Sequence, residues 1–188
     1  SNYYTNIDEL LNIENVDFVD VVTTMETHLT IAKILAKKNV ATSMQKPFAE
    51  NLSDAKKIVR LYKNTNTPLM VHENFRWQTP LMEVKKLSKK YNLKNPQYAK
   101  ISFRHANPVG YTNQTYLYGL DEYLILDVGI HLYDLSRFFL GEADSVYTVN
   151  QNTNKKFKGE TAFTSIVRHQ NKGVSIVDAS ISSIKTPD

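Results

Sequence analysis

Two groups of polar residues in this sequence have the types and spacing that acid–base chemistry needs. In the first, Asp127 and His131 stand four residues apart in LDVGIHLYDLSRFF, and Asp134 follows three residues later. On an α-helix these side chains share one face, and a carboxylate beside an imidazole orients it for proton transfer. The same spacing fits a hydrogen-bonded core histidine, which is the commoner case. A metal site is a third and weaker interpretation, because no second histidine stands at ligand spacing.

The second group is Gln45–Lys46–Pro47, which directly follows the apolar segment NVATSM. Ligands of open α/β sheets bind beyond the carboxyl ends of the strands, where a lysine can hold and polarise a substrate oxygen. Pro47 disfavours helical geometry at Lys46 and so directs this residue toward the crevice; position alone also fits a surface loop. Three loops are expected at this sheet edge: Thr23–Thr24, Gln45–Lys46 and His72–Glu73–Asn74.

The elements that must position these groups alternate in the first part of the chain. Strands are expected over 16–23, 39–44 and 68–73, and helices over 6–13 and 26–38 and from Asn51 onward. Asn6 and Asn51 are expected as the N-caps of the first and last of these helices. The segment 16–23 is β-branched without clean alternation, which predicts a strand buried on both faces. A strand–helix–strand–helix–strand order is half of a doubly wound sheet. No glycine precedes Gly110, so no glycine loop that cradles phosphate lies in that part.

The pattern changes after Trp77. A helix is expected from Thr79, as its cap, to about Lys90, a half-exposed strand over 97–105, an aromatic loop over 106–120 and a long helix over 122–140 that Gly141 ends. Further strands follow, two of them joined by a hairpin at 170–173. Gly129 within the long helix costs about 1 kcal/mol against alanine, which indicates that a flat group approaches the backbone there.

The predicted fold is therefore α/β followed by α+β. Residues 1–75 form the C-terminal half of a Rossmann-type parallel sheet, and residues 76–188 form a second domain whose mostly antiparallel open sheet packs on helices.

Composition narrows the class of protein. The chain has 188 residues, 41% hydrophobic and 22% charged, which is enough for a core. No apolar run approaches the ~20 residues that span a bilayer. The absence of cysteine excludes disulfides and thiolate metal sites. A net charge of +4 is too small for a dedicated nucleic-acid binder, and the lysines between 85 and 90 fit a solvated helix face. We expect neither a nucleic acid nor a membrane as partner.

Four stretches together resemble the Gfo/Idh/MocA oxidoreductase family: VDFVDVVTTMETH, NVATSMQKP, VHENFRW and LDVGIHLYDLSRFFLGE. They occur in the family's order and at its separations, and the resemblance covers nearly the whole chain. It implies a dehydrogenase that uses NAD or NADP and transfers a hydride between the cofactor and a secondary hydroxyl of a sugar, cyclitol or related polyol. It also implies that residues 76–188 are the substrate-binding and dimerisation domain.

The resemblance also assigns site residues. The family's catalytic lysine, aspartate and histidine map onto Lys46, Asp127 and His131, with Trp77 joining Lys46 and His131 on the substrate side. A core tryptophan is the alternative for Trp77. The tyrosines of the middle segment, Tyr111, Tyr116, Tyr118 and Tyr123, supply surfaces that suit carbohydrates. The cofactor contacts carried over are Thr23, Thr24, His28, Gln45, Asn74 and Arg76.

Two departures from the family pattern matter. Gln45 stands where the family has a glutamate before the lysine, which removes a negative charge beside Lys46. The glycine-rich N-terminal βαβ unit and the C-terminal part of the substrate domain are not in the sequence. We therefore expect a truncated chain that is inactive alone, and the choice between NAD and NADP stays open.

Alternatives to a dehydrogenase are a non-catalytic fragment or dimerisation module of the family, and redox-assisted glycoside cleavage or lyase chemistry. We further expect a cytoplasmic protein that forms a homo-oligomer through its open sheet.

Overall fold

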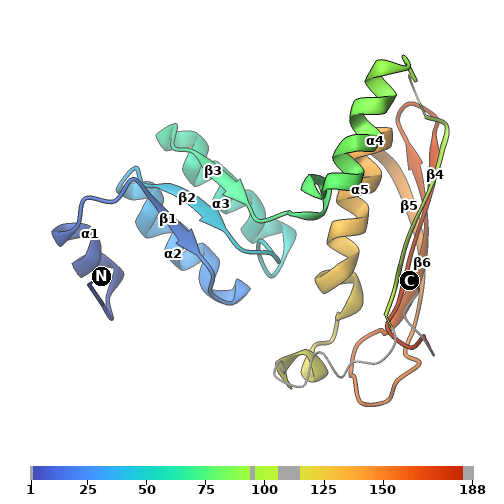
Figure 1. Cartoon of the computed structure of the whole chain (residues 1–188). Helices are drawn as coiled ribbons and strands as arrows, with labels where there is room; N and C mark the ends of the chain where they lie inside the picture. Colours follow the sequence, from blue (N-terminus) through green and yellow to red (C-terminus); the bar gives the residue numbers. More distant parts are fainter. Residues whose placement is uncertain (1, 94–95, 106–114, 184–188) are drawn as a thin grey trace. The chain divides into compact units, whose positions relative to one another are not determined.

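The computed structural model describes residues 2–93, 96–105 and 115–183, and the chain divides into two compact units, Ser1–Glu73 and Asn74–Asp188 (Figure 1). The first unit contains α1 (Ile7–Ile13), β1 (Phe18–Val21), α2 (Met25–Lys37), β2 (Ala41–Met44), α3 (Leu52–Thr65) and β3 (Leu69–Val71). Its strands form a parallel sheet in the order β1-β2-β3. The predicted alternation of strands and helices is confirmed.

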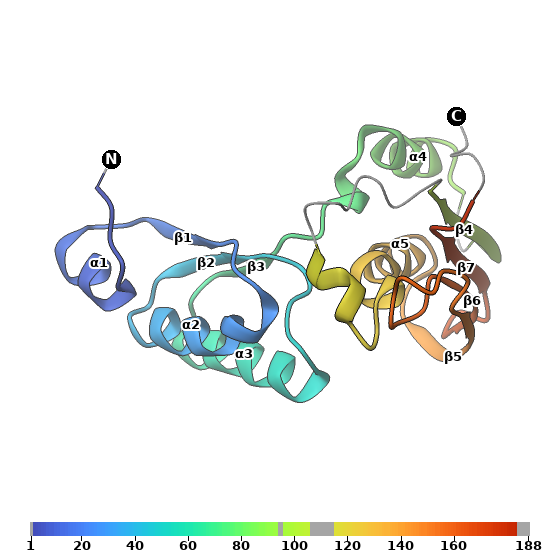
Figure 2. The same ribbon diagram turned by 90° about the horizontal axis from the view of Figure 1, so that it is seen from below.

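Helices α2 and α3 lie on the same face of this sheet (Figure 2). Both crossovers run in the same direction along the sheet, and right-handed crossovers of that kind place both helices on one side. The buried core of the unit is made of Val21, Ala32, Leu35, Ala36, Met44, Ile58 and Tyr62. The Tyr62 hydroxyl donates to Oγ1 of Thr42 at 2.7 Å, which satisfies the one polar group of that ring.

The expectation that β1 is buried on both faces is wrong. Val21 is 3% exposed on the helix-covered face, whereas Phe18 is 62% exposed on the other. Because α2 and α3 share one face, no described helix covers the opposite side of the sheet. The continuous run of apolar residues predicted the strand correctly, but it did not predict how many faces of the strand are covered.

Asparagine side chains begin the helices of this unit. Asn6 accepts the backbone N–H groups of Asp8 and Glu9 at the start of α1, and Asn51 accepts that of Asp54 at the start of α3. These bonds satisfy donors that have no partner within the helix. Both caps agree with the sequence prediction.

The second unit begins with the short 3₁₀ helix η1 (Phe75–Trp77). It continues through α4 (Thr79–Lys90), β4 (Tyr98–Arg104), the 3₁₀ turn η3 (Thr115–Gly119), the π-helical turn η4 (Ile125–Gly129), α5 (Ile130–Leu140), β5 (Ala143–Gln151), β6 (Ala162–His169) and β7 (Val174–Ser180). Its sheet has the order β4-β7-β6-β5. Strands β5, β6 and β7 pair antiparallel and β4 pairs parallel with β7, so the sheet is mostly antiparallel, as predicted. Helix α5 packs on β4 and β7.

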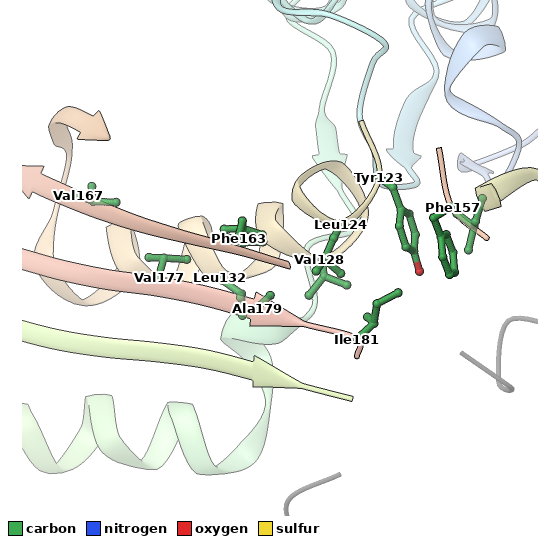
Figure 3. Packing of buried hydrophobic residues seen from close by; sticks show 11 residues of the cluster. Tyr123, Leu124, Val128, Leu132, Phe157, Phe163, Val167, Val177, Ala179 and Ile181 are labelled. Carbon is green, nitrogen blue, oxygen red and sulfur yellow. The ribbon is translucent and has the colours of Figure 1, made fainter. Parts of the chain in front are cut away.

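The core of the second unit gathers between α5 and the inner face of the sheet (Figure 3). It contains Val128, Leu132, Phe163, Val177 and other residues of these elements. A Cβ atom on Gly129 would meet the ring of Phe163 at 3.1 Å. The flat group that Gly129 admits is therefore a core phenylalanine of this chain.

Two local expectations differ from the structure. Gln78, not Thr79, precedes the first turn of α4, and Thr79 is its first helical residue. The helix expected over 122–140 begins as the π-helical turn η4 and becomes α-helical at Ile130. Of the aromatic loop, residues 106–114, including Tyr111, lie outside the described residues. In the described ranges no helix is both long and apolar enough to cross a membrane.

Candidate active site

The carboxyl ends of β1, β2 and β3 lie level at one edge of the first unit's sheet. Val21 is in register with Met44, and Met44 with Val71. The backbone continues this register past the strand ends, since the N–H of Gln45 donates to the Val21 carbonyl and the N–H of His72 to the Met44 carbonyl, both at 2.9 Å. The three loops expected at this edge therefore begin side by side.

Thr23 and Thr24 form the exposed turn between β1 and α2. The Oγ1 atoms of Thr23 and Thr27 lie 2.7 Å apart, and the Thr27 hydroxyl donates to the Thr24 carbonyl at 2.8 Å. The pKa of Glu26 is lowered first by a hydrogen bond from its own backbone N–H and then by one from the Thr24 side chain. Hydroxyl groups in a turn ordered in this way are suited to binding a polar ligand.

His28 lies behind this turn and has no exposed surface. Its Nδ1 is 3.1 Å from the carbonyl oxygen of Phe48, and its Nε2 is 3.1 Å from that of Thr23. Both ring nitrogens thus face backbone of this chain. His28 joins the loop after β1 to the loop after Lys46. The cofactor contact that the resemblance implies for it stays a prediction.

Gln45 and Lys46 begin the loop after β2 and are partly buried. The N–H of Lys46 donates to Oε1 of Gln45 at 2.7 Å, so the Gln45 side chain folds back over the start of its own loop. The Lys46–Pro47 peptide is cis. Nearby at the same edge, His72 Nε2 lies 3.0 Å from a carboxylate oxygen of Asp20. The edge thus carries amide, ammonium, hydroxyl and imidazole groups.

Asp127 and His131 lie on the second unit, on η4 and α5. The N–H of Ile130 reaches the carbonyl of Ile125, five residues earlier, and this bond widens the turn that carries Asp127. Asp127 is partly buried and His131 is 5% exposed. A π-helical turn of this kind often marks a functional site.

A buried carboxylate holds the start of this turn. Glu160, which is 8% exposed, accepts the N–H of Ile125 at 2.7 Å and that of Tyr123 at 3.2 Å. The first N–H groups of a helical segment have no intrahelical partner and attract negative charge. Sequence analysis did not single out Glu160, because a glutamate next to a strand carries no signal of such a distant contact.

Two consecutive residues of η1 contact α5. The ring of Phe75 stacks on the imidazole of His131, with 4.2 Å between centroids and 8° between planes. Arg76 donates through Nε to one carboxylate oxygen of Asp134 at 2.7 Å, and through Nη2 to the other. The guanidinium expected at a cofactor is thus paired with Asp134, the third member of the polar helix face. Sequence analysis gave Phe75 no contact with His131, because no local pattern predicts a stack between residues so far apart in the chain.

The two remaining residues expected near η1 are Asn74 and Trp77. Asn74 precedes η1 and makes no capping hydrogen bond with its side chain. Trp77 is 67% exposed, which excludes the alternative that it is a core tryptophan and leaves its ring available for contact.

Tyr116, on η3, is electrostatically coupled to Asp127. Loss of solvent around the phenol and, second, the negative charge of Asp127 raise the pKa of Tyr116 above its ordinary value of 10.0. The phenol therefore keeps its proton and can donate a hydrogen bond near Asp127. The prediction of a tyrosine-lined ligand surface is wrong for Tyr123, which has no exposed surface and stacks on Phe157 in the core of the second unit, and Tyr118 packs against the same core. Tyr116 is exposed and stays a candidate for contact with a hydroxylated ligand.

Both units match models of one known protein family. Residues 1–73 match the model of the oxidoreductase family with an NAD-binding Rossmann fold, GFO_IDH_MocA, and residues 81–187 match the GFO/IDH/MocA C-terminal domain. The chain belongs to the Gfo/Idh/MocA family. The resemblance drawn from the sequence motifs is confirmed, and the two matched regions agree with the two units of this Gfo/Idh/MocA chain.

Several relatives are similar over most of the chain. A D-apiose dehydrogenase of Rhizobium rhizogenes is 42% identical over 87% of this chain and 47% of its own length. One from Paraburkholderia graminis is 34% identical over 96% of the chain and 48% of its own. The crystal structure of an oxidoreductase from Agrobacterium radiobacter in complex with NAD+, L-tartaric acid and magnesium has a TM-score of 0.91 and 39% identity, over 96% of this chain and 52% of that one. The chain spans about half the length of the curated relatives it matches.

Proposed function

We propose that this chain is part of an NAD-dependent dehydrogenase that oxidises a secondary hydroxyl of a sugar or related polyol. The observation that carries the proposal is the polar face of the second unit, where the buried imidazole of His131 follows a π-helical turn bearing Asp127. Membership of an oxidoreductase family and the NAD+ bound by a 39% identical neighbour support it.

The first unit has groups that suit part of a dinucleotide. The hydroxyls of Thr23 and Thr24 and the Gln45 amide stand at the carboxyl edge of the parallel sheet, where nucleotides bind in such folds. Asn74 and Arg76 were also assigned to the cofactor; the Arg76–Asp134 pair argues for a supporting role for Arg76. Residues 1–109 contain no glycine, so a glycine-rich pyrophosphate loop does not come from that part of the chain.

The proposed chemistry uses three polar side chains of this chain, and one aromatic side chain borders the substrate. Bound nicotinamide supplies the hydride acceptor. His131 accepts the proton of the substrate hydroxyl on an imidazole nitrogen. The Lys46 ammonium donates a hydrogen bond to the same oxygen and stabilises its developing negative charge. Asp127 orients the imidazole and the substrate, and the exposed ring of Trp77 borders the substrate.

The proposed substrates are small polyhydroxylated molecules. Two relatives are named D-apiose dehydrogenases and a third, 26% identical, is a myo-inositol 2-dehydrogenase of Thermotoga maritima. The phenol of Tyr116 and the ring of Trp77 offer the hydrogen-bonding and stacking groups that such molecules use. D-apiose is therefore the first sugar to test.

The test is NAD+ reduction by the full-length protein with D-apiose, inositols, aldonates and common pentoses. His131→Ala and Lys46→Met should each lower kcat by roughly 10²- to 10⁴-fold, while the Kd for NAD+ in His131→Ala stays within a few-fold of wild type. Turnover that survives in both variants would refute the acid–base proposal. Absence of reduction with every sugar, by a protein that binds NAD+, would favour the non-catalytic alternative.

We also propose that the second unit forms a homo-oligomer through the outer face of its sheet. Tyr147 of β5 and Ile166 of β6 are cross-strand neighbours and are 71% and 53% exposed, and Val149 beside them is 50% exposed. Contiguous apolar surface of this kind marks interaction sites. Ile166→Glu should convert an oligomer to a monomer in sedimentation experiments.

A cytoplasmic location stays an expectation, which fractionation of source cells would test.

A further inference from the structure

The contact between Phe75 and His131 is close to an ideal parallel stack. The ring centroids lie 4.2 Å apart and the planes differ by 8°. Phe75 is itself packed against the buried core of the second unit, and His131 is 5% exposed. An imidazole on a helix can rotate about its last side-chain bond, and a fixed ring against one face removes that freedom. The stack therefore fixes the plane in which both imidazole nitrogens point.

A second contact holds Phe75 in this position. The next residue, Arg76, pairs with both carboxylate oxygens of Asp134, which lies one helical turn beyond His131. The Arg76 guanidinium carbon also lies 5.2 Å from the centre of the Phe138 ring, one turn further still. Planar, two-point pairs of this type are specific in geometry. Segment η1 is thus attached to three successive turns of the helix that carries His131.

We propose that Phe75 is a positioning residue that orients the imidazole of His131 for proton transfer, and that the Arg76–Asp134 pair keeps Phe75 in place. This inference rests on the proposed acid–base function of His131. It gives Asp134 and Arg76 a task distinct from direct contact with cofactor or substrate. It also explains the polar face of α5: the histidine performs the chemistry and the aspartate beyond it fixes the segment that aligns the histidine.

The experiment compares Phe75→Leu with Phe75→Tyr in the full-length enzyme. Leucine keeps apolar volume but has no plane, so kcat should fall roughly 10- to 100-fold, while the Kd for NAD+ stays within about twofold. Tyrosine keeps the ring and should restore kcat to within about threefold of wild type. Asp134→Asn, which retains the shape of the side chain, should lower kcat by a smaller factor, because the neutral amide holds Arg76 less tightly.

A spectroscopic measurement tests the stack independently of activity. The carbon-bound protons of the His131 ring lie over the Phe75 ring, whose circulating electrons shift their NMR signals upfield. The shift should be present in wild type and in Phe75→Tyr and absent in Phe75→Leu. Leu140→Ala is the control, because Leu140 is 2% exposed at the far end of α5. It should lower the stability of the unit without changing kcat or the His131 signals.

The outcomes separate this inference from the proposed function. Undiminished turnover in His131→Ala would refute the proposed function itself. If His131→Ala is inactive but Phe75→Leu turns over like wild type, the function stands and the positioning role of Phe75 is wrong. If Phe75→Leu does not fold, two other results would still overturn the inference. One is a His131 NMR signal in wild type that shows no upfield shift. The other is a loss of kcat in Phe75→Tyr as large as that in His131→Ala.

Discussion

The carboxylate of Glu160 lies 2.7 Å from the backbone nitrogen of Ile125, across 35 residues of chain. Through this bond the segment that precedes β6 fixes the first turn of the polar helix. Because Asp127 is the second residue after Ile125, the position of a proposed catalytic carboxylate depends on a buried glutamate in a different part of the second unit.

Glu160→Ala should destabilise the second unit by about 2–3 kcal/mol, since it leaves the buried N–H groups of Tyr123 and Ile125 without their acceptor. Glu160→Gln retains one oxygen acceptor and should lose less. Urea unfolding followed by the fluorescence of Trp77, the only tryptophan in the sequence, measures the change. Glu142, which pairs with Arg137 at the surface, is the control, and Glu142→Gln should leave the midpoint nearly unchanged. Equal midpoints for all three variants would contradict the role of Glu160.

Asp178 makes the stability of the second unit depend on pH. Burial by itself would raise the pKa of this carboxyl, but hydrogen bonds from Ser102 and Arg104 and the charge of Arg104 together hold it below the ordinary 3.8. A carboxyl whose pKa is lower in the folded state adds stability above its unfolded pKa, and this contribution is lost as the pH falls through the folded value. The unfolding free energy of wild type should therefore decrease below about pH 4.

Asp178→Asn tests this dependence. The variant should be less stable than wild type near neutral pH, and its stability should change less steeply between about pH 4 and pH 2. Asp144→Asn, on exposed strand β5 with its carboxylate 3.7 Å from Arg168, serves as the matched control and should retain the wild-type slope. An unchanged slope in Asp178→Asn would show that other carboxyls govern acid unfolding.

Gly129→Ala should destabilise the second unit although alanine is the better helix former by about 1 kcal/mol. The added methyl would meet the Phe163 ring at 3.1 Å, and Phe163 is 3% exposed in a packed core and has little room to move. In the background of Phe163→Leu the same substitution should become neutral or stabilising. A double-mutant cycle of thermal unfolding gives the coupling between the two positions; a coupling of zero would mean that the ring yields freely.

His28→Leu should separate the two loops that His28 joins. Both carbonyl oxygens that the ring contacts, those of Thr23 and Phe48, would lose a buried partner, and the first unit should lose about 1–3 kcal/mol of stability. The amide resonances of β1 and β2 during urea unfolding report this change, and the Kd for NAD+ should rise in parallel. His72→Leu, at a side chain that is 27% exposed, should cost at most about 1 kcal/mol. A larger effect at His72 than at His28 would reverse this assignment.

Much of the fold was predictable from the sequence, because the local signals for helices and strands agreed with the topology that the chain adopts. Asn6 and Asn51 began helices where their side chains predicted, and the crossover order β1-β2-β3 followed from the alternation of patterns. The sequence did not predict that one face of β1 is exposed. Apolar composition indicates that a strand can be buried, but it does not indicate which elements cover it. Nor did the sequence predict the π-helical turn, since the spacing of Asp127 and His131 fits an ordinary helix equally well.

The site was predicted only as far as chemistry shows in residue type. Residue type and spacing made Lys46, Asp127 and His131 candidates only, because the same patterns fit a surface loop and a core histidine; their catalytic roles are what the resemblance to the family implies. The contacts of Phe75 with His131 and of Glu160 with Ile125 were not predicted, since they join residues 56 and 35 positions apart and no local pattern encodes them. The catalytic assignments themselves stay predictions until the variants are measured.

The parallel pairing of β4 with β7 has a consequence for how the polypeptide is made. Ser102 and Asp178 are 76 residues apart in sequence yet bonded, so this sheet cannot close until almost all of its strands have left the ribosome. The first unit, built from neighbouring crossovers, can acquire its structure during synthesis. During synthesis, the strand edges of the second unit will therefore stay unpaired for longer than those of the first unit. We expect chaperones to bind mainly to this second part of the nascent chain.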